Sequence, residues 1–192
     1  AGAGPAGLFC AYILAEAGFR PIVIERGSRV EKRTCDVQKF WESGILNPKS
    51  NVQFGEGGAG TFSDGKLNTS VKDPSGRNRL VLETFVRFGA DPSILYDNKP
   101  HIGTDVLSEV IVNMREFLVD NGATFVFDTC VNNLDIVSQK LLSVYTDSDS
   151  NSNSEIKTDV CVLALGHSAR DTFDMLYNKG FDMECKSFAV GF

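Results

Sequence analysis

The chain has 192 residues, of which 42% are hydrophobic and 23% charged, and its formal net charge is −6 at pH 7. This is the balance of a globular domain that can bury a core. The acidic charge argues against nucleic-acid binding, and apolar runs as short as VCVLAL cannot span a membrane. The five cysteines are scattered and no secretory signal is visible. We therefore expect a cytoplasmic protein with reduced thiols and no metal site.

The N-terminal stretch predicts a helix followed by a short strand. GAGPAGLFCAYILAEAG carries apolar side chains at helical intervals and stops at Gly18. Pro5 suits the first helical turn, where its missing N–H costs nothing. PIVIE, residues 21–25, then predicts a short buried strand that ends at the carboxylate of Glu25.

The rest of the chain predicts alternating helices and strands. Residues 29–75 are expected to be loop-rich, with a short helix near VQKFWES in which Trp41 packs in the core. Further helices are expected over RLVLETFVRF up to Gly89, from Thr104 as the cap up to Gly122, and over 168–180. ATFVFD and DVCVLALG are expected strands, the second central and buried. VNNLDIVS and LLSVYT should form an antiparallel pair, followed by the polar tip DSDSNSNS. This order predicts an α/β fold built on a doubly wound sheet.

The first motif that carries chemistry is G-x-G-x-x-G, formed by Gly2, Gly4 and Gly7 directly before a helix. Glu25 follows at the end of the next strand, where a carboxylate can accept ribose hydroxyls. A plain glycine turn does not explain Glu25, so the motif predicts dinucleotide binding. The strand expected before Gly2 is missing and the sequence stops within the extended-looking KSFAVGF. We therefore expect a piece truncated at both ends.

A second glycine-rich stretch, FGEGGAGTFSDGKL at residues 54–67, lacks one requirement of a phosphate-binding loop. Leu67 stands where that loop needs a hydroxyl for Mg²⁺, which argues against a nucleotide hydrolase. FAD needs backbone to approach along its ribityl chain and ring, and Gly57, Gly58 and Gly60 permit this. A third small-residue strip, Ala164 to Gly166, ends the expected central strand. Three such segments at one sheet edge fit FAD better than NAD.

These motifs, together with HIGTD and VLALGHSARDTF, resemble the uncharacterised FAD-dependent dehydrogenases of the glutathione-reductase-like flavoprotein superfamily. The resemblance implies a non-covalently bound FAD, held at adenosine and pyrophosphate by the first motif with Glu25 and Arg26. It also implies that residues 57–67 lie along the flavin and that Gly166 closes over the cofactor. The expected cofactor-binding residues are Gly2, Gly4, Pro5, Ala6, Gly7, Glu25, Arg26, Gly57, Gly58, Ala59, Gly60, Ser63, Lys66, Leu67, Ala164 and Gly166.

The resemblance divides the chain into three parts. Residues 1–28 and 104–180 are expected to form the FAD/NAD(P)-binding Rossmann-like domain, with a β-hairpin or meander crossover. Residues 29–103 are an insertion, and 181–192 begin a truncated substrate domain. The expected function is an FAD-dependent oxidoreductase that transfers hydride, with NAD(P)H as a candidate electron donor. An NAD(P)-binding Rossmann dehydrogenase and a non-catalytic, RNA-associated flavin module stay open as alternatives. Substrate, catalytic residues and oligomeric state are not indicated, and His167 with Arg170 reads best as a polar pair at a helix start.

Overall fold

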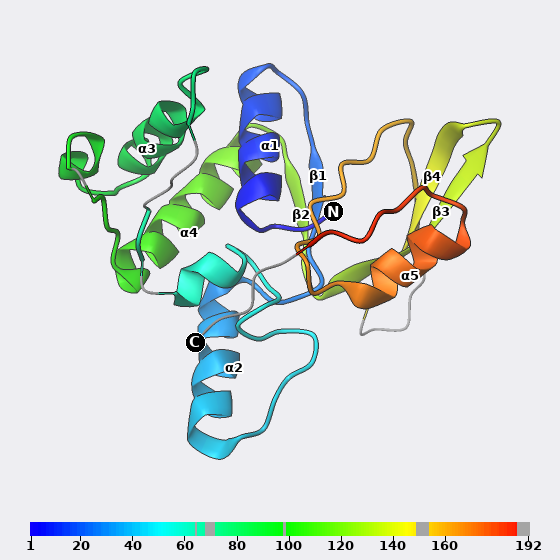
Figure 1. Cartoon of the computed structure of the whole chain (residues 1–192), viewed down its shortest axis with the longest axis horizontal. Coiled ribbons are helices and arrows are strands. Elements are labelled where there is room, and N and C mark those ends of the chain that lie inside the picture. Colours follow the sequence, from blue (N-terminus) through cyan, green and yellow to red (C-terminus); the bar gives the residue numbers. More distant parts are fainter. Residues whose placement is uncertain (64, 68–71, 98, 149–153, 188–192) are drawn as a thin grey trace.

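The structure, a computed structural model, describes residues 1–63, 65–67, 72–97, 99–148 and 154–187. Twelve elements follow one another along these residues (Figure 1). They are α1 (Pro5–Glu16), β1 (Ile22–Ile24), α2 (Val30–Ser43), the 3₁₀ turn η1 (Ala59–Phe62), α3 (Arg77–Arg87), the 3₁₀ turn η2 (Pro92–Leu95), α4 (Thr104–Asp120), β2 (Thr124–Val126), β3 (Thr129–Val137), β4 (Lys140–Ser148), β5 (Ser154–Lys157) and α5 (Arg170–Asn178).

A short parallel sheet forms the centre of the fold. β1 pairs with β2 in parallel, with Val23 opposite Phe125. On the other side of β1, the amide of Gly2 donates to the carbonyl oxygen of Ile24 at 2.7 Å. The carbonyl oxygen of Ala1 in turn accepts from the amide of Ala164 at 2.7 Å. Residues 1–2 therefore lie between β1 and residues 162–164. All three segments end at the same edge of the central sheet.

One face of this sheet is covered by α1 and α4, which share a hydrophobic core with α3. The core includes Leu8, Val110, Met114 and Leu118, all nearly inaccessible to solvent. α3 joins it through aromatic contacts: the rings of Phe9 and Phe85 lie 5.6 Å apart, and those of Tyr12 and Phe88 5.8 Å apart. The loop-rich segment that carries α3 is thus packed against the first helix.

The opposite face is covered by a three-stranded antiparallel sheet and α5 (Figure 1). β4 lies in the middle of this second sheet, between β3 and β5. Ile24 of the central sheet packs here with Val131, Leu134, Val144 and Leu176. Helices on one face and a β-meander on the other give a mixed α/β, Rossmann-like fold, and this confirms the predicted fold class.

The helices α2 and α4 begin differently from what the sequence predicted. α2 begins at Val30, whereas only a short helix near residues 37–43 was expected. Its buried face consists of Val30, Arg33 and Val37, so a charged residue interrupts the apolar pattern. The N-cap of α4 is Gly103, and Thr104 is its first helical residue, so the expected Thr104 cap is wrong.

The segment DVCVLALG does not form the expected strand. In the described part of the chain its backbone pairs with Ala1, and the side chains of Val160 and Val162 are 70% and 48% exposed. Trp41 is also not in the core: it is 64% exposed and its ring meets that of Phe62 edge-on at 6.3 Å. β5 was not predicted, and residues 149–153 of the polar tip lie outside the described part of the chain. Among the described residues, no helix has the length and apolar character needed to cross a membrane.

Candidate dinucleotide-binding site

The first glycine motif packs the start of α1 tightly against the sheet. Gly2 has φ +98°, and a Cβ there would overlap the carbonyl oxygen of Ala164. A Cβ on Gly7 would overlap the carbonyl oxygen of Gly2. Gly4 is the N-cap of α1, Pro5 follows it, and no described side chain caps the helix. The first-turn amides of α1 are therefore available to an anion.

The second glycine loop, which we define as residues 55–58, lies directly against the first motif. The amide of Gly57 donates to the carbonyl oxygen of Ala3 at 2.8 Å. A Cβ on Gly58 would come within 2.9 Å of the Pro5 ring. A Cβ on Gly27 would come within 2.6 Å of the Gly55 backbone. Backbone approaches backbone at these crossings, which leaves no room for side chains.

Glu25 is the carboxylate that joins these backbone segments. It is only 5% exposed. Its Oε2 accepts from the amide of Ala3 at 2.7 Å, and its Oε1 accepts from the amides of Gly27 at 2.9 Å and Gly55 at 3.0 Å. A carboxylate can accept about four hydrogen bonds, so Glu25 retains capacity for about one more, on Oε2.

Arg26 follows Glu25 and is fixed by polar and aromatic neighbours. Its guanidinium donates to Asp171 at 2.8 Å, to Thr172 at 3.1 Å and to the thiol of Cys130 at 3.3 Å. The same group lies 4.5 Å from the centre of the Phe54 ring. Burial disfavours the charge most strongly, but the hydrogen bond to Asp171 and the charge interactions with Cys130, Asp171 and Glu25 together outweigh it, so the pKa of Arg26 is raised.

A cavity of about 400 Å³ opens where these segments meet. It falls in the range of about 300–1,000 Å³ that is typical of ligand sites. Its lining brings together these expected residues: Gly2, Gly4, Pro5, Ala6, Glu25, Arg26, Gly58, Ala59, Ala164 and Gly166. The three glycine and small-residue segments, which are far apart in the sequence, thus contribute to one cavity at the end of the parallel strands.

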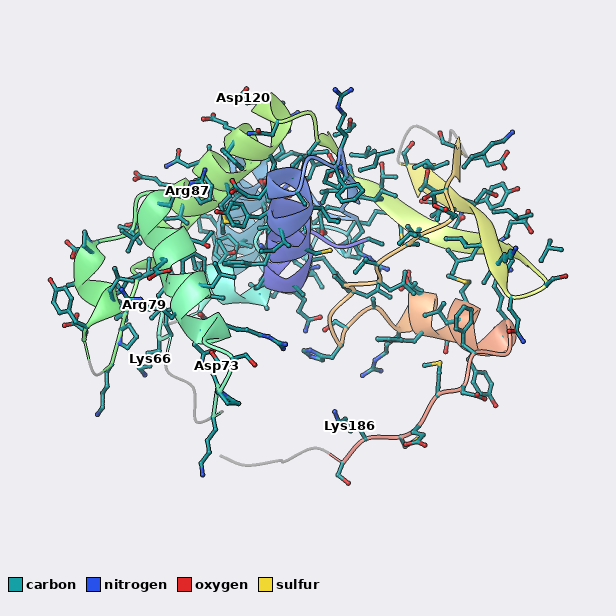
Figure 2. All side chains as sticks on the ribbon, turned by 90° about the horizontal axis from the view of Figure 1, so that it is seen from above. Lys66, Asp73, Arg79, Arg87, Asp120 and Lys186 are labelled. Carbon is teal, nitrogen blue, oxygen red and sulfur yellow. The ribbon has the colours of Figure 1, made fainter. Side chains whose placement is uncertain are left out.

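The other expected residues lie outside this lining: Gly7, Gly57, Gly60, Ser63, Lys66 and Leu67. The Ser63 hydroxyl donates to the Gly60 carbonyl at 2.8 Å, and Leu67 packs against the first core. Lys66 is exposed and forms a backbone bridge with His101. It lies with Asp73 and Arg79 on the side of the molecule that carries α3 (Figure 2). A cofactor role for these residues, as for those that line the cavity, stays a prediction.

Several wall residues were not anticipated from the sequence. They are Ala1, Ile24, Gln53, Phe54, Gly55, Thr129, Cys130, Val131, Leu163, Ser168, Ala169, Thr172, Phe173 and Leu176. Leu165 of the third strip also lines the cavity, as does His167, for which a plain helix-start role was expected. Phe54 and Gly55 begin the glycine-rich stretch at residues 54–67, and their position in that stretch could have indicated that they line the cavity. Thr129, Cys130 and Val131 reach the cavity from β3, and Thr172, Phe173 and Leu176 reach it from α5; local pattern does not report such packing. Among the described residues, no cluster of His, Cys, Asp or Glu could hold a metal ion.

Arg33 holds the second glycine loop from α2. Its side chain is fully buried and donates to four backbone carbonyls of the loop region: Asn51 at 2.9 Å, Val52 at 3.0 Å, Gly55 at 3.3 Å and Glu56 at 2.6 Å. Its guanidinium also lies 4.8 Å from the centre of the Phe62 ring. Burial lowers the pKa of Arg33 to about 10, so it remains a cation at neutral pH.

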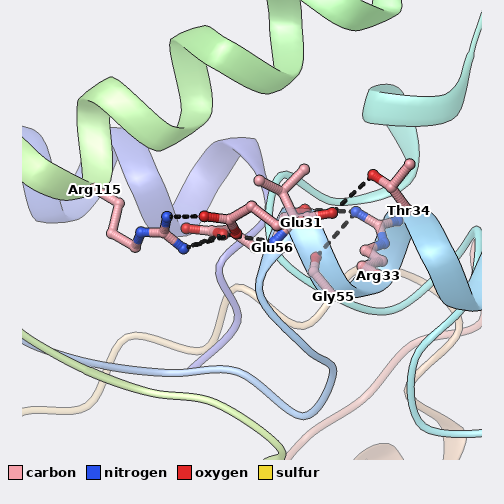
Figure 3. Close-up of polar contacts among 7 residues, drawn as sticks. Glu31, Arg33, Thr34, Gly55, Glu56 and Arg115 are labelled. Atoms are coloured by element: carbon pink, nitrogen blue, oxygen red, sulfur yellow. Dashed lines mark hydrogen bonds and ion pairs between the residues drawn. The ribbon is translucent and has the colours of Figure 1, made fainter.

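Glu56 holds the same loop from inside. Its side chain is fully buried, and Oε2 accepts from the amide of Val30 at 2.8 Å and from Arg115 at 2.9 Å. Arg115, from α4, also pairs with Glu31 at 2.6 Å (Figure 3). The loop is therefore tied to the N-terminus of α2 and to α4.

The fold and this cavity define a Rossmann-like α/β domain, the class of fold that binds dinucleotides at the carboxyl edge of its parallel strands. A family model described as an NAD(P)-binding Rossmann-like domain matches residues 1–31. This range covers the first glycine motif, α1, β1 and Glu25.

Three proteins with similarity to the chain are as follows. It is 46% identical over 190 residues to a Clostridium beijerinckii protein named "Uncharacterized protein", a match that covers 99% of this chain and 34% of that protein. The chain thus spans about a third of that relative. THI4 from Thermovibrio ammonificans has a similar structure, with a TM-score of 0.57 and 19% identity over 94% of this chain and 61% of THI4. An L-amino acid deaminase from Proteus myxofaciens gives a TM-score of only 0.46, with 16% identity over 95% of this chain and 47% of that one.

Proposed function

We propose that this chain is the cofactor-binding part of an FAD-dependent oxidoreductase. The observation that carries the proposal is the convergence of three close-packed backbone segments on one cavity, beside the N-terminus of α1 and Glu25. The glycine-rich stretch at residues 54–67 supports FAD over a nicotinamide cofactor. FAD is longer and needs a second backbone segment that can approach it closely.

The cavity residues fit the two ends of an adenosine diphosphate group. The amide of Ala6, in the first turn of α1, faces a pyrophosphate with the positive end of the helix dipole. Glu25 accepts one ribose hydroxyl on Oε2, the oxygen with a single backbone donor. Arg26, stacked on Phe54, borders the same cavity and keeps its charge.

The bound FAD supplies hydride transfer through its isoalloxazine ring. The chain's own residues bind and orient it and exclude water around the pyrophosphate. We assign residues 1–28 and 104–180 to the FAD domain, 29–103 to the insertion and 181–192 to the start of a substrate domain, of which 188–192 lie outside the described residues. NAD(P)H as electron donor, a cytoplasmic location and membership of the FAD-dependent dehydrogenase family belong to the same proposal.

Replacing Gly4 with Ala tests the cofactor role without disturbing the fold. The backbone at Gly4 is extended, with φ −75°, and an added Cβ would meet only Gly58 Cα, at 3.7 Å. Alanine is a poorer N-cap than glycine, so the free energy of unfolding should fall by about 1 kcal/mol. The methyl group blocks the approach of a pyrophosphate to the helix, so the Kd for FAD should rise about tenfold or more. Isothermal titration with FAD and, in parallel, with NAD and NADP measures it.

Gly103→Ala is the matched control, because Gly103 is also a helix N-cap with extended backbone and an added Cβ would meet nothing within 4 Å. It lies outside the cavity lining, and FAD affinity should not change. Tighter binding of NAD or NADP than of FAD would replace the proposal by the simple Rossmann dehydrogenase. FAD binding without turnover in a reductase assay of the whole protein would favour the non-catalytic flavin module.

A further inference from the structure

The second glycine loop is fixed by a carboxylate with an incomplete set of partners. Oε2 of Glu56 has two donors, but Oε1 has no hydrogen-bond partner among the residues that the structure describes. The hydroxyl of Thr61, in η1, is also buried and also has no hydrogen-bond partner among the described residues. A buried oxygen without a partner costs far more free energy when it carries charge than when it is neutral.

The charges that face Glu56 come from two helices. Arg115 on α4 and Arg29, the N-cap of α2, favour the ionised carboxylate, as does the amide of Val30. Burial and the nearby carboxylate of Glu31 favour the protonated form. Burial dominates and raises the pKa of Glu56 to about 7. Arg33 is a further cation that acts on Glu56 from α2.

A change at Glu56 reaches the cavity through the loop itself. Gly55 and Gly58 line the cavity, Gly57 donates to Ala3, and the adjoining η1 carries Phe62 beneath the guanidinium of Arg33. Movement of this loop away from the first motif therefore removes part of the cavity wall and one backbone hydrogen bond.

We propose that Glu56 is a proton-controlled latch on the second glycine loop: protonated Glu56 keeps the loop packed against the first glycine motif, and its ionisation loosens the loop and weakens dinucleotide binding. The affinity part of this inference rests on the proposed function, whereas the loop movement does not.

The sign follows from the folded and unfolded values of the pKa. The folded value, about 7, is above the ordinary 4.5 of the unfolded chain. The stabilisation is therefore fully present below pH 4.5 and is lost as the pH rises through about 7. The latch is closed in mildly acidic solution and opens in mildly alkaline solution.

Trp41 offers a reporter that needs no ligand. It is the single tryptophan of the chain, and its ring contacts Phe62 at the end of η1. We expect the tryptophan fluorescence of the wild-type chain to change with a midpoint near pH 7, with stronger quenching by acrylamide on the alkaline side. Glu56→Gln cannot ionise and should show no such transition.

Two further variants keep the test decisive. Glu42→Gln removes an exposed carboxylate next to Trp41, and the transition should persist in it. Arg115→Gln removes a cation that favours ionised Glu56, so its midpoint should move to higher pH. If Glu56→Gln fails to fold by circular dichroism, the shift in Arg115→Gln decides the matter, and an unshifted midpoint overturns the latch.

The ligand measurement separates the latch from the cofactor. With FAD as the probe, we expect the wild-type Kd to be about tenfold higher at pH 8 than at pH 6, and the Glu56→Gln Kd to be the same at both. A fluorescence transition that depends on Glu56, without FAD binding at either pH, retains the latch and removes the proposed function. FAD binding with a pH dependence that survives in Glu56→Gln overturns the latch.

Discussion

Arg33→Met is expected to lower the free energy of unfolding by about 3–5 kcal/mol. The substitution leaves four carbonyl oxygens around the second glycine loop without their common donor. Methionine keeps much of the apolar stem, so the loss comes from hydrogen bonds and not from a cavity. Urea unfolding, compared at equal slope, measures the change.

Two further variants help to interpret the stability of Arg33→Met. Arg33→Lys keeps the charge but cannot reproduce the planar fork of donors, so it should recover only part of the loss. Lys39→Met, on the exposed side of the same helix, should change stability by less than about 0.5 kcal/mol. A loss below about 1 kcal/mol in Arg33→Met would mean that water replaces the guanidinium easily and that the loop is not held from α2.

Glu25→Ala is expected to cost about 3 kcal/mol in stability and at least tenfold in FAD affinity. Three buried amides, of Ala3, Gly27 and Gly55, lose their acceptor together. The affinity falls because the ribose acceptor is gone and because the two glycine segments are no longer joined. Chemical unfolding and FAD titration measure the two effects on the same protein samples.

Glu25→Gln distinguishes the structural role of this side chain. Its one carbonyl oxygen can still accept from Gly27 and Gly55, while its amide nitrogen faces the amide of Ala3. The stability loss should therefore fall between those of wild type and Glu25→Ala. Glu109→Ala, an exposed carboxylate on α4, serves as the control. Equal stability of Glu25→Ala and wild type would show that the three amides find other acceptors.

Local pattern in the sequence was enough for the first part of the site. The glycine spacing, the apolar face of α1 and the strand that ends at Glu25 are set by neighbours within a few residues, and the structure has them as expected. The three backbone segments that converge on the cavity were also recognisable, because small residues at strand ends mark close approach. What local pattern missed was the use of Glu25 as a backbone acceptor.

The remaining errors have a common physical origin in partners that are distant in the sequence. Arg33 breaks the apolar pattern of α2 because its partners are loop carbonyls, so the start of that helix was missed. Glu56 meets Arg115 across 59 positions, and no periodicity connects them. Trp41 was expected in the core from its size alone, but exposure depends on which element covers it. After η1, Ser63 and Gly65 belong to no helix or strand, and nothing local fixes where such residues go.

The contact between α1 and α3 has a consequence for how the protein could be dissected. Phe9 and Tyr12 of α1 pack on Phe85 and Phe88, which belong to the stretch from residue 29 to 103. Deleting residues 29–103 would expose the rings of Phe9 and Tyr12 to solvent. It would also remove Arg33 and Glu56 together with the glycine loop that they hold. Because residues 29–103 share this core with α1, we expect them to unfold together with that helix and not as a separate module.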